Sequence, residues 1–252
     1  MSDNVETAAR TEPMIVEQLD AEIVRITFNR PDKRNAMNQV ARLALMEALA
    51  SVNGRCKVVI LTGAGTAFCS GVDRKEIHPD SGREWRAVQD AIKRHSAIII
   101  SAVNGIALGG GATLINVSEL AIAAEEAEIG MPEVTFGVYP ALAGPSTQLR
   151  LSQKRAAWMV LTGERISGRI AEEWGLVNKC VPLASLQDEA LAVARKIAGY
   201  DGVTLEYSKK ALWDIPHHLS DWTAALEYGE LANGQIQRRR AALATHYGKE
   251  NS

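Results

Sequence analysis

The feature that most constrains the fold is an alternation of short apolar runs with stretches of helical periodicity in the first half of the chain. Residues 24–28 alternate in character and predict a strand, whereas residues 58–61 and 98–103 are continuous apolar runs, typical of strands buried on both faces. Residues 39–52 carry apolar side chains at helical spacing, and residues 83–94 are also predicted to be helical. Strands that alternate with helices imply right-handed β–α–β crossovers and mostly parallel pairing.

The second half of the chain changes character. A triple glycine, Gly109 to Gly111, leads into a short apolar helix, and a further strand is predicted over residues 119–124. From about Pro140 the pattern is nearly all helical, interrupted by a predicted strand over residues 177–181. Helices that follow an α/β core either cover that core or meet another subunit, and the sequence leaves both possibilities open.

We therefore predict three regions: a flexible tail over residues 1–14, an α/β core over residues 15–200, and a C-terminal helical region over residues 201–252. The tail is polar, has no apolar signal segment and contains three acidic residues, which argues against a targeting peptide. The longest apolar stretch, residues 97–103, is too short to span a bilayer. We expect a cytoplasmic protein that does not bind membranes.

Charge and cysteine content exclude several functions. The chain has 28 basic and 30 acidic residues, a net charge of −2, so it lacks the basic field that gathers nucleic acid or anionic lipid. Its three cysteines, Cys56, Cys69 and Cys180, have no short spacing and predict free thiols rather than a disulfide framework or a zinc site. No histidine pair has metal-ligand spacing, so we expect no metal.

Several segments, taken in this order and spacing, resemble the crotonase superfamily, also called the enoyl-CoA hydratase/isomerase family. They are residues 26–37 (ITFNRPDKRNAM), 58–63 (VVILTG) running into 67–73 (AFCSGVD), 102–111 (AVNGIALGGG) continuing to 130–134 (GMPEV), 160–166 (VLTGERI) and 174–177 (WGLV). The resemblance covers roughly residues 15–215. It implies a crotonase-like spiral of ββα turns, a homotrimer or dimer of trimers, and chemistry on acyl-CoA thioesters, with coenzyme A as part of the substrate and no other cofactor.

A thioester carbonyl that becomes an enolate or a tetrahedral oxyanion needs two hydrogen-bond donors fixed before the reaction begins. Gly110 lies where a loop enters a helix, so its N–H should be free and aligned with the positive end of the helix dipole. By resemblance, the N–H of Val72 is the second donor. The alternative is that both segments are merely tight turns.

Glu133 is the leading acid/base candidate, because it occupies the family's second glutamate position and a carboxylate beside an apolar pocket can exchange protons near neutral pH. The alternative is a surface glutamate or one that only begins a helix, since Pro-Glu is a common start of a helix. Thr113 stands where hydratases of the family usually carry a first glutamate, and a hydroxyl is no general base at neutral pH. We therefore expect the Thr113 side chain only to orient water or to line the pocket. Double-bond isomerisation, hydration, hydration with carbon–carbon cleavage, and thioester hydrolysis remain open.

The resemblance also implies the coenzyme A contacts. Backbone and side-chain groups of two loops are expected to bind it, together with the two oxyanion-hole residues: Arg34, Ala36, Val72, Asp73, Arg74, Lys75 and Gly110. The basic side chains among them, with Lys33, are expected to meet phosphates, the alternative being ordinary solvated charges. Trp85 and Tyr139 are candidates for the acyl pocket or for core packing.

A function without catalysis also remains open at this stage. A few relatives bind RNA, and residues 238–240 form a small basic cluster of three arginines. The net charge argues against nucleic acid as the main partner. The presence of Gly110, Val72 and Glu133 together argues against a protein that only provides a scaffold.

Overall fold

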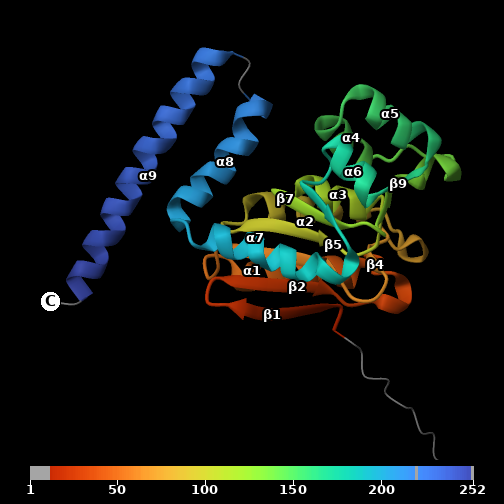
Figure 1. Ribbon diagram of the computed structural model, residues 1–252, viewed down its shortest axis with the longest axis horizontal. Helices are drawn as coiled ribbons and strands as arrows, with labels where there is room; N and C mark the ends of the chain where they lie inside the picture. The colour runs from red at the N-terminus through yellow and green to blue at the C-terminus, as the bar shows by residue number, and fades with distance from the viewer. Residues whose placement is uncertain (1–11, 219–220, 251–252) are drawn as a thin grey trace, which may run out of the picture.

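Two sheets form the core of the computed structural model, which describes residues 12–218 and 221–250 (Figure 1). The larger sheet has the order β1 (Met14–Asp20), β2 (Ile23–Phe28), β3 (Val58–Gly63), β5 (Ile98–Val103), β7 (Leu120–Ala124) and β10 (Lys179–Val181). The smaller sheet has the order β4 (Ala67–Cys69), β6 (Ile106–Leu108), β8 (Glu128–Gly130) and β9 (Arg165–Ser167). Neighbouring strands are parallel except for the pairs β1–β2 and β8–β9.

Helices cover both faces of the larger sheet, which explains why its central strands are apolar along their whole length. Val59 and Leu61 of β3 face a cluster that includes α1 (Gln39–Val52) and α2 (Ser81–Arg94). Val58 and Ile60 of the same strand face α7 (Leu186–Ala198) on the opposite side. Successive side chains of a strand point to opposite faces, so an apolar partner on each face selects an uninterrupted apolar run.

Shorter helices connect the strands and border the second sheet. They are η1 (Pro31–Lys33), η2 (Arg74–Glu76), α3 (Gly110–Val117), η3 (Pro132–Phe136), α4 (Ala143–Arg150), α5 (Gln153–Thr162), α6 (Gly168–Trp174) and η4 (Leu183–Ser185). Every residue of α3 is buried, in keeping with its lack of charged side chains. A helix that is enclosed on all sides holds its N-terminus in a fixed place, which matters for the site below.

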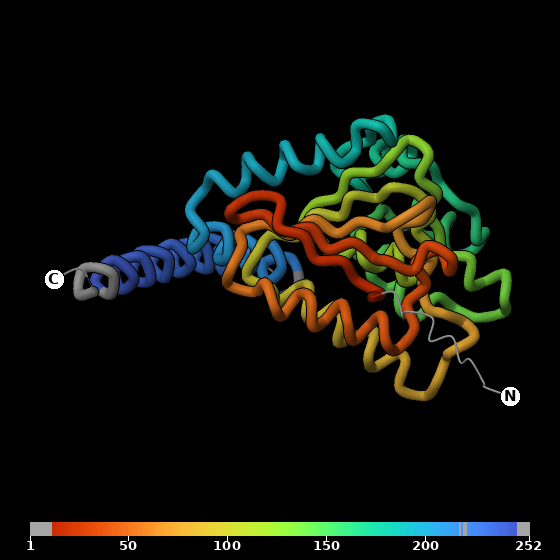
Figure 2. Tube along the Cα trace, turned by 90° about the horizontal axis from the view of Figure 1, so that it is seen from below, coloured from red at the N-terminus to blue at the C-terminus, as the bar shows by residue number. Residues whose placement is uncertain are grey.

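The last two helices, α8 (Gly202–His218) and α9 (Trp222–Glu250), form a hairpin, and α9 projects away from the sheets (Figures 1 and 2). A buried ion pair docks α8: Lys209 Nζ lies 3.1 Å from a carboxylate oxygen of Glu119, whose other oxygen accepts from Trp213 Nε1 at 3.0 Å. Glu119 is therefore a structural residue that fixes α8 to the core.

Two arginines of the C-terminal basic cluster join α9 to α8. Arg239 pairs with Glu206 at 2.8 Å and Arg240 pairs with Asp201 at 2.8 Å. In the described residues these two charges are therefore neutralised within the chain. These ion pairs argue against the interpretation of the cluster as a contact for nucleic acid.

The structure confirms the mixed, mostly parallel α/β fold and the principal strands and helices predicted from periodicity. It adds β1, which begins at Met14, the last residue assigned to a flexible tail; residues 1–11 of that tail lie outside the described residues. It also adds four three-residue strands, β4, β6, β8 and β9. Within the described ranges, no helix is long and apolar enough to cross a membrane.

Candidate active site

The candidate site is built on three adjacent parallel strands of the smaller sheet, β4, β6 and β8. Because parallel strands end at the same edge, the segments that follow them meet there. Residues 70–72 follow β4, Gly109 and Gly110 follow β6, and residues 131–133 follow β8. The three motifs that are separated in sequence thus come together at one edge of one sheet.

Gly109 has a backbone conformation that only glycine adopts readily, with φ 51° and ψ −108°, and its N–H donates to Gly130 O at 2.9 Å. This turn ends β6 and begins α3 at Gly110. As the first residue of α3, Gly110 has no acceptor for its N–H inside the helix. That N–H is therefore an available donor at the positive end of a buried helix.

Val72 supplies a second available donor. Its segment forms a single bridge with Met37, in which Met37 N–H donates to Gly71 O at 2.8 Å and Asp73 N–H donates to Met37 O at 3.2 Å. These two hydrogen bonds use the carbonyl of Gly71 and the N–H of Asp73, on either side of Val72. The N–H of Val72 takes no part in the bridge. A Cβ on Gly71 would lie only 3.2 Å from Gly110 N and 2.7 Å from Leu108 O, so the two donor loops are in close contact.

Glu133 lies on η3, where its carboxyl group reaches the Gly109 turn. Its Oε1 lies 2.5 Å from the place that a Cβ on Gly109 would occupy, so the absence of a side chain at Gly109 makes room for the carboxyl group. Its Oε2 is buried and has no hydrogen-bond partner among the described residues. Burial raises the pKa of the Glu133 carboxyl above its usual value.

Thr113 is completely buried on α3, one turn after Gly109. Its hydroxyl donates to Gly109 O at 3.3 Å, an acceptor in its own helix. Such bonds from threonine to the preceding turn are common within helices. The Thr113 side chain is therefore engaged by the backbone of the turn, and Glu133 is the carboxyl group that contacts the Gly109 turn in the described structure.

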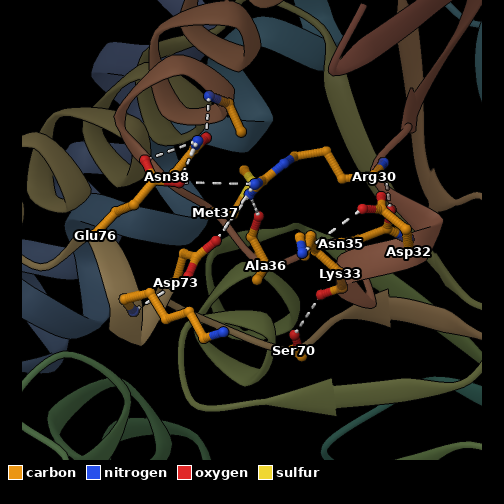
Figure 3. Close-up of polar contacts among 12 residues, drawn as sticks. Arg30, Asp32, Lys33, Asn35, Ala36, Met37, Asn38, Ser70, Asp73 and Glu76 are labelled. Carbon is orange, nitrogen blue, oxygen red and sulfur yellow. Dashed lines mark hydrogen bonds and ion pairs between the residues drawn. The ribbon is translucent and has the colours of Figure 1, made fainter. Parts of the chain in front are cut away.

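Polar contacts join two loops, residues 30–38 and residues 70–76 (Figure 3). Arg30 reaches from the end of β2 to Ala36 O and to the carboxylate of Asp73, 3.3 Å away. The other oxygen of Asp73 accepts from the backbone N–H of Lys75 at 3.2 Å. Asp73 therefore holds its loop in place rather than presenting a free charge. Ala36 belongs to the first of these loops and is partly exposed.

The expected coenzyme A side chains are at the surface. Arg34 has a left-handed backbone (φ 50°), and its carbonyl accepts from Ser70 N–H at 3.0 Å, so the first loop contacts the segment before Val72. Arg34, Arg74 and Lys75 are exposed. The Arg74 guanidinium lies over the Phe136 ring, 3.8 Å from its centroid, and so links η2 to η3. Phe136 was not predicted from the sequence as part of the site, because no local pattern signals a contact between segments so far apart.

The two aromatic candidates for the acyl pocket behave differently. Trp85 on α2 is fully buried, and its ring lies 2.5 Å from the place of a Cβ on Gly110. Tyr139 is about half exposed and its hydroxyl accepts from Gln148 at 2.9 Å, so it belongs to the surface. Trp85 therefore both packs in the core and borders the candidate oxyanion hole. Among the described residues, no group of histidine, cysteine and acidic side chains is arranged to hold a metal.

Comparisons with known proteins agree with this architecture. The family model for enoyl-CoA hydratase/isomerase matches residues 18–215. The human enoyl-CoA hydratase domain-containing protein 3, mitochondrial, is 32% identical over 222 residues, covering 82% of this chain and 72% of that protein. A hydroxycinnamoyl-CoA hydratase-lyase of Pseudomonas fluorescens is 30% identical over 207 residues, covering 76% and 75%.

A solved structure shows the same fold over nearly the whole chain. The crystal structure of an enoyl-CoA hydratase of Mycobacterium smegmatis superimposes with a TM-score of 0.85 at 26% identity, covering 94% of this chain and 96% of that one. The spiral predicted from the sequence is thus the fold observed, and the enzyme class predicted from it is the class of these relatives. The chain belongs to the enoyl-CoA hydratase/isomerase family of the crotonase superfamily.

Proposed function

We propose that this enzyme moves a proton beside the thioester carbonyl of an enoyl-CoA, with Glu133 as its single acid/base. The observation that carries the proposal is the state of the partly buried Glu133 carboxyl group. Its Oε2 is buried and unpartnered among the described residues, its pKa is raised, and its Oε1 lies against the Gly109 turn. A carboxyl group with a raised pKa is suited to take up and return a proton near neutral pH.

In this mechanism the thioester oxygen accepts hydrogen bonds from the N–H groups of Val72 and Gly110. Neither group has an acceptor in the part of the chain that the structure describes, and both belong to backbone that close contacts hold in place. Donors fixed in advance stabilise charge as it develops on the oxygen without reorganising at the moment of reaction. They would stabilise an enolate in this way.

The reaction that one carboxylate supports best is a shift of the carbon–carbon double bond. Glu133 removes a proton from the carbon next to the thioester, and the electron pair of that bond moves toward the thioester oxygen. The same carboxyl group then returns the proton to the far carbon of the extended enolate. No water is added and no second carboxylate is needed, which fits a site where Thr113 bonds to Gly109 O.

A second candidate is hydration with carbon–carbon cleavage. The identity to a hydroxycinnamoyl-CoA hydratase-lyase favours it. In that reaction Glu133 would activate the attacking water. Thioester hydrolysis with water placed by Thr113 is less well supported, because the Thr113 hydroxyl is fully buried and bonded to the backbone. A purely scaffolding role does not explain why the buried Oε2 of Glu133 lacks a partner in the described structure while two backbone N–H groups nearby are also unused there.

For the coenzyme A moiety, the exposed basic side chains of Arg34, Arg74 and Lys75 are suited to its phosphates. Ala36 and the loop held by Asp73 would present backbone groups to the rest of the moiety. We propose that coenzyme A enters only as part of the substrate and that the reaction uses no other cofactor and no metal. Removal of metals with a chelator should then leave activity unchanged.

We also propose that the chain assembles as a homotrimer or a dimer of trimers. Large apolar side chains remain exposed on α9 and on the α4–α5 region, namely Trp222, Leu226, Leu231, Leu149, Trp158 and Leu161. Exposed apolar faces of this extent favour association. Light scattering at micromolar concentration tests the proposal, and a monomer would contradict it. The three free thiols support a reducing compartment such as the cytoplasm.

The decisive experiment offers the enzyme a panel of enoyl-CoA esters and follows the products by mass spectrometry in deuterated water. A double-bond shift gives an isomer of unchanged composition apart from deuterium, hydration adds one water, and cleavage gives two smaller products. Glu133→Gln should bind acyl-CoA by calorimetry but lose turnover by about 10²–10⁴-fold. Full activity of Glu133→Gln would overturn the mechanism.

A further inference from the structure

We propose that Arg42 is a positioning residue for the oxyanion hole. Its buried guanidinium fixes the carbonyl of Met37, and the Met37 backbone in turn holds the segment that presents the Val72 N–H to the thioester oxygen. In this proposal Arg42 acts only through Met37 and does not touch the substrate. The inference rests on the proposed function, since it takes the Val72 N–H as a donor to the thioester oxygen.

The first observation is how the Val72 segment is held. The Met37 N–H donates to Gly71 O at 2.8 Å, and the Met37 carbonyl accepts from Asp73 N–H at 3.2 Å. In a parallel bridge of this kind, the residue between the two bonds turns its own N–H away from the partner segment. The direction of the Val72 N–H therefore depends on where Met37 lies.

The second observation is a bond from Arg42 to the same carbonyl. Arg42 Nη1 donates to Met37 O at 2.8 Å, and both atoms are buried. A carbonyl oxygen has two lone pairs, and here Arg42 and the Asp73 N–H take one each. The bond from Arg42 is the shorter of the two and comes from a charged donor, so it contributes more to the direction of the Met37 carbonyl.

The start of α1 brings Arg42 back onto Met37. Asn38 caps this helix, because its Oδ1 accepts from Ala41 N–H at 3.0 Å, and its carbonyl accepts from Arg42 N–H at 3.0 Å. Met37 is thus the residue before the cap, and Arg42 is the fourth residue of the helix. These are the two positions whose side chains commonly meet at the start of a helix.

Partners on α1 and α2 fix the guanidinium itself. Its Nε and Nη2 donate to one carboxylate oxygen of Glu84 at 3.0 and 2.6 Å, and the other oxygen of Glu84 accepts from Gln39 at 2.7 Å. The Arg42 side chain has no exposed surface. A buried ion pair is often no more stabilising than apolar residues of the same volume, so the contribution of this pair lies in orientation. The planar guanidinium aims Nη1 at Met37 O.

A second arginine holds the preceding carbonyl (Figure 3). Arg30 donates to Ala36 O and pairs with the Asp73 carboxylate at 3.3 Å. These contacts of Arg30 lie within the two loops, whereas Arg42 joins the first loop to Glu84 of α2. Arg42 therefore connects the oxyanion-hole segment to the helices that cover the larger sheet.

The test removes the guanidinium without leaving a charge buried alone. In the double variant Arg42→Met with Glu84→Gln, methionine keeps an apolar stem and both charges of the pair disappear, so the chain should still fold. The matched control makes the same two substitutions at the buried pair that docks α8, Lys209→Met with Glu119→Gln. Circular dichroism and thermal melting establish that both double variants are folded.

The kinetic readout separates kcat from KM. Removing one oxyanion-hole donor costs about 10²–10³-fold in kcat, and Arg42 only aims such a donor, so its double variant should lose about 10–10²-fold. KM for the enoyl-CoA should change little, because the surface groups expected to bind coenzyme A are unaltered. Arg42→Lys keeps the charge beside Glu84 but lacks the planar fork, so it should recover only part of the lost kcat. The control should keep the kcat and KM of the wild-type enzyme.

A second readout needs no turnover. A saturated acyl-CoA with a ¹³C-labelled thioester carbonyl binds without reacting, and hydrogen bonds to its oxygen lower the C=O stretching frequency in an infrared difference spectrum. The wild-type enzyme and the control should lower this frequency equally. The double variant at Arg42 and Glu84 should lower it less when saturated with the same ligand.

The outcomes distinguish this inference from the proposed function. Glu133→Gln should lower the C=O frequency as much as the wild-type enzyme does, because Glu133 is not one of the oxyanion-hole donors. A wild-type frequency and kcat in the double variant at Arg42 would refute the role of Arg42 and leave the proposed function intact. Equal losses in the control would show that Arg42 is only structural. If the wild-type enzyme did not lower the frequency at all, the proposed oxyanion hole would be wrong, and this inference with it.

Discussion

Replacing Gly109 with alanine probes how the turn after β6 positions the Glu133 carboxyl group. A Cβ at this position would lie 2.5 Å from Glu133 Oε1, whereas ordinary contact begins at 3.4 Å, so the carboxyl group would have to retreat by about 0.9 Å. The atom that moves is the far end of a flexible side chain, so the protein can accommodate the change. The catalytic geometry, however, would be displaced.

The magnitude follows from two separate effects. A displacement of about 1 Å in a reacting group is enough to lower turnover by about 10²-fold. In addition, alanine at φ 51° stores backbone strain of about 1–3 kcal/mol. In a chain of this size each kcal/mol lowers Tm by about 2–4 °C, so the variant should melt a few degrees early and still fold.

Gly54→Ala is the matched control. Gly54 also has a positive φ, 75°, but a Cβ there would meet nothing within 4 Å, and the residue lies in the turn after α1. Gly54→Ala should lower Tm by about as much as Gly109→Ala does, and it should keep the kcat/KM of the wild-type enzyme. Steady-state kinetics and calorimetric melting of both variants make the comparison. If Gly109→Ala kept wild-type turnover, the position of Glu133 beside this turn would have no bearing on the reaction.

Three further predictions concern the surroundings of the site and the docking of α8. Thr113→Ala should change turnover by less than about fivefold, because the lost bond is one ordinary hydrogen bond to Gly109 O; a loss as large as that of Glu133→Gln would show that Thr113 places water. Lys209→Met should lower the free energy of unfolding by about 3–5 kcal/mol, because it leaves the Glu119 carboxylate buried without its cation. Urea unfolding measures this effect, and the double variant with Glu119→Gln should recover part of it. Burial lowers the pKa of His95 to about 4, below the ordinary value of 6.5 for histidine, and the neutral ring accepts from Ala97 N–H and donates to Leu49 O. The unfolded chain therefore binds more protons between these values, so stability should fall as pH drops through this window. His95→Gln should flatten that dependence in urea titrations, and an equal slope would contradict the assignment.

Several features of the fold could be predicted from the sequence because they depend on local patterns. The apolar runs that became β3 and β5 identify strands buried on both faces, and α1 was predicted with the bounds that the structure gives it. The order of the glycine-containing segments around Val72 and Gly110, with Glu133 after them, indicated the family. The three-residue strands β4, β6 and β8 escaped detection, because so short a segment has no period to recognise.

Only the tertiary structure decided which of these segments meet and what each side chain does there. It placed the ends of β4, β6 and β8 at one edge, left Glu133 Oε2 and Trp85 Nε1 buried without partners, and paired Asp73 with Arg30 instead of leaving it free. It also joined Lys209 to Glu119 across the chain. The physical reason is the range of the interactions: periodicity and turn chemistry act within a few residues, whereas burial, pairing and pKa depend on neighbours that only packing of the whole chain brings into contact.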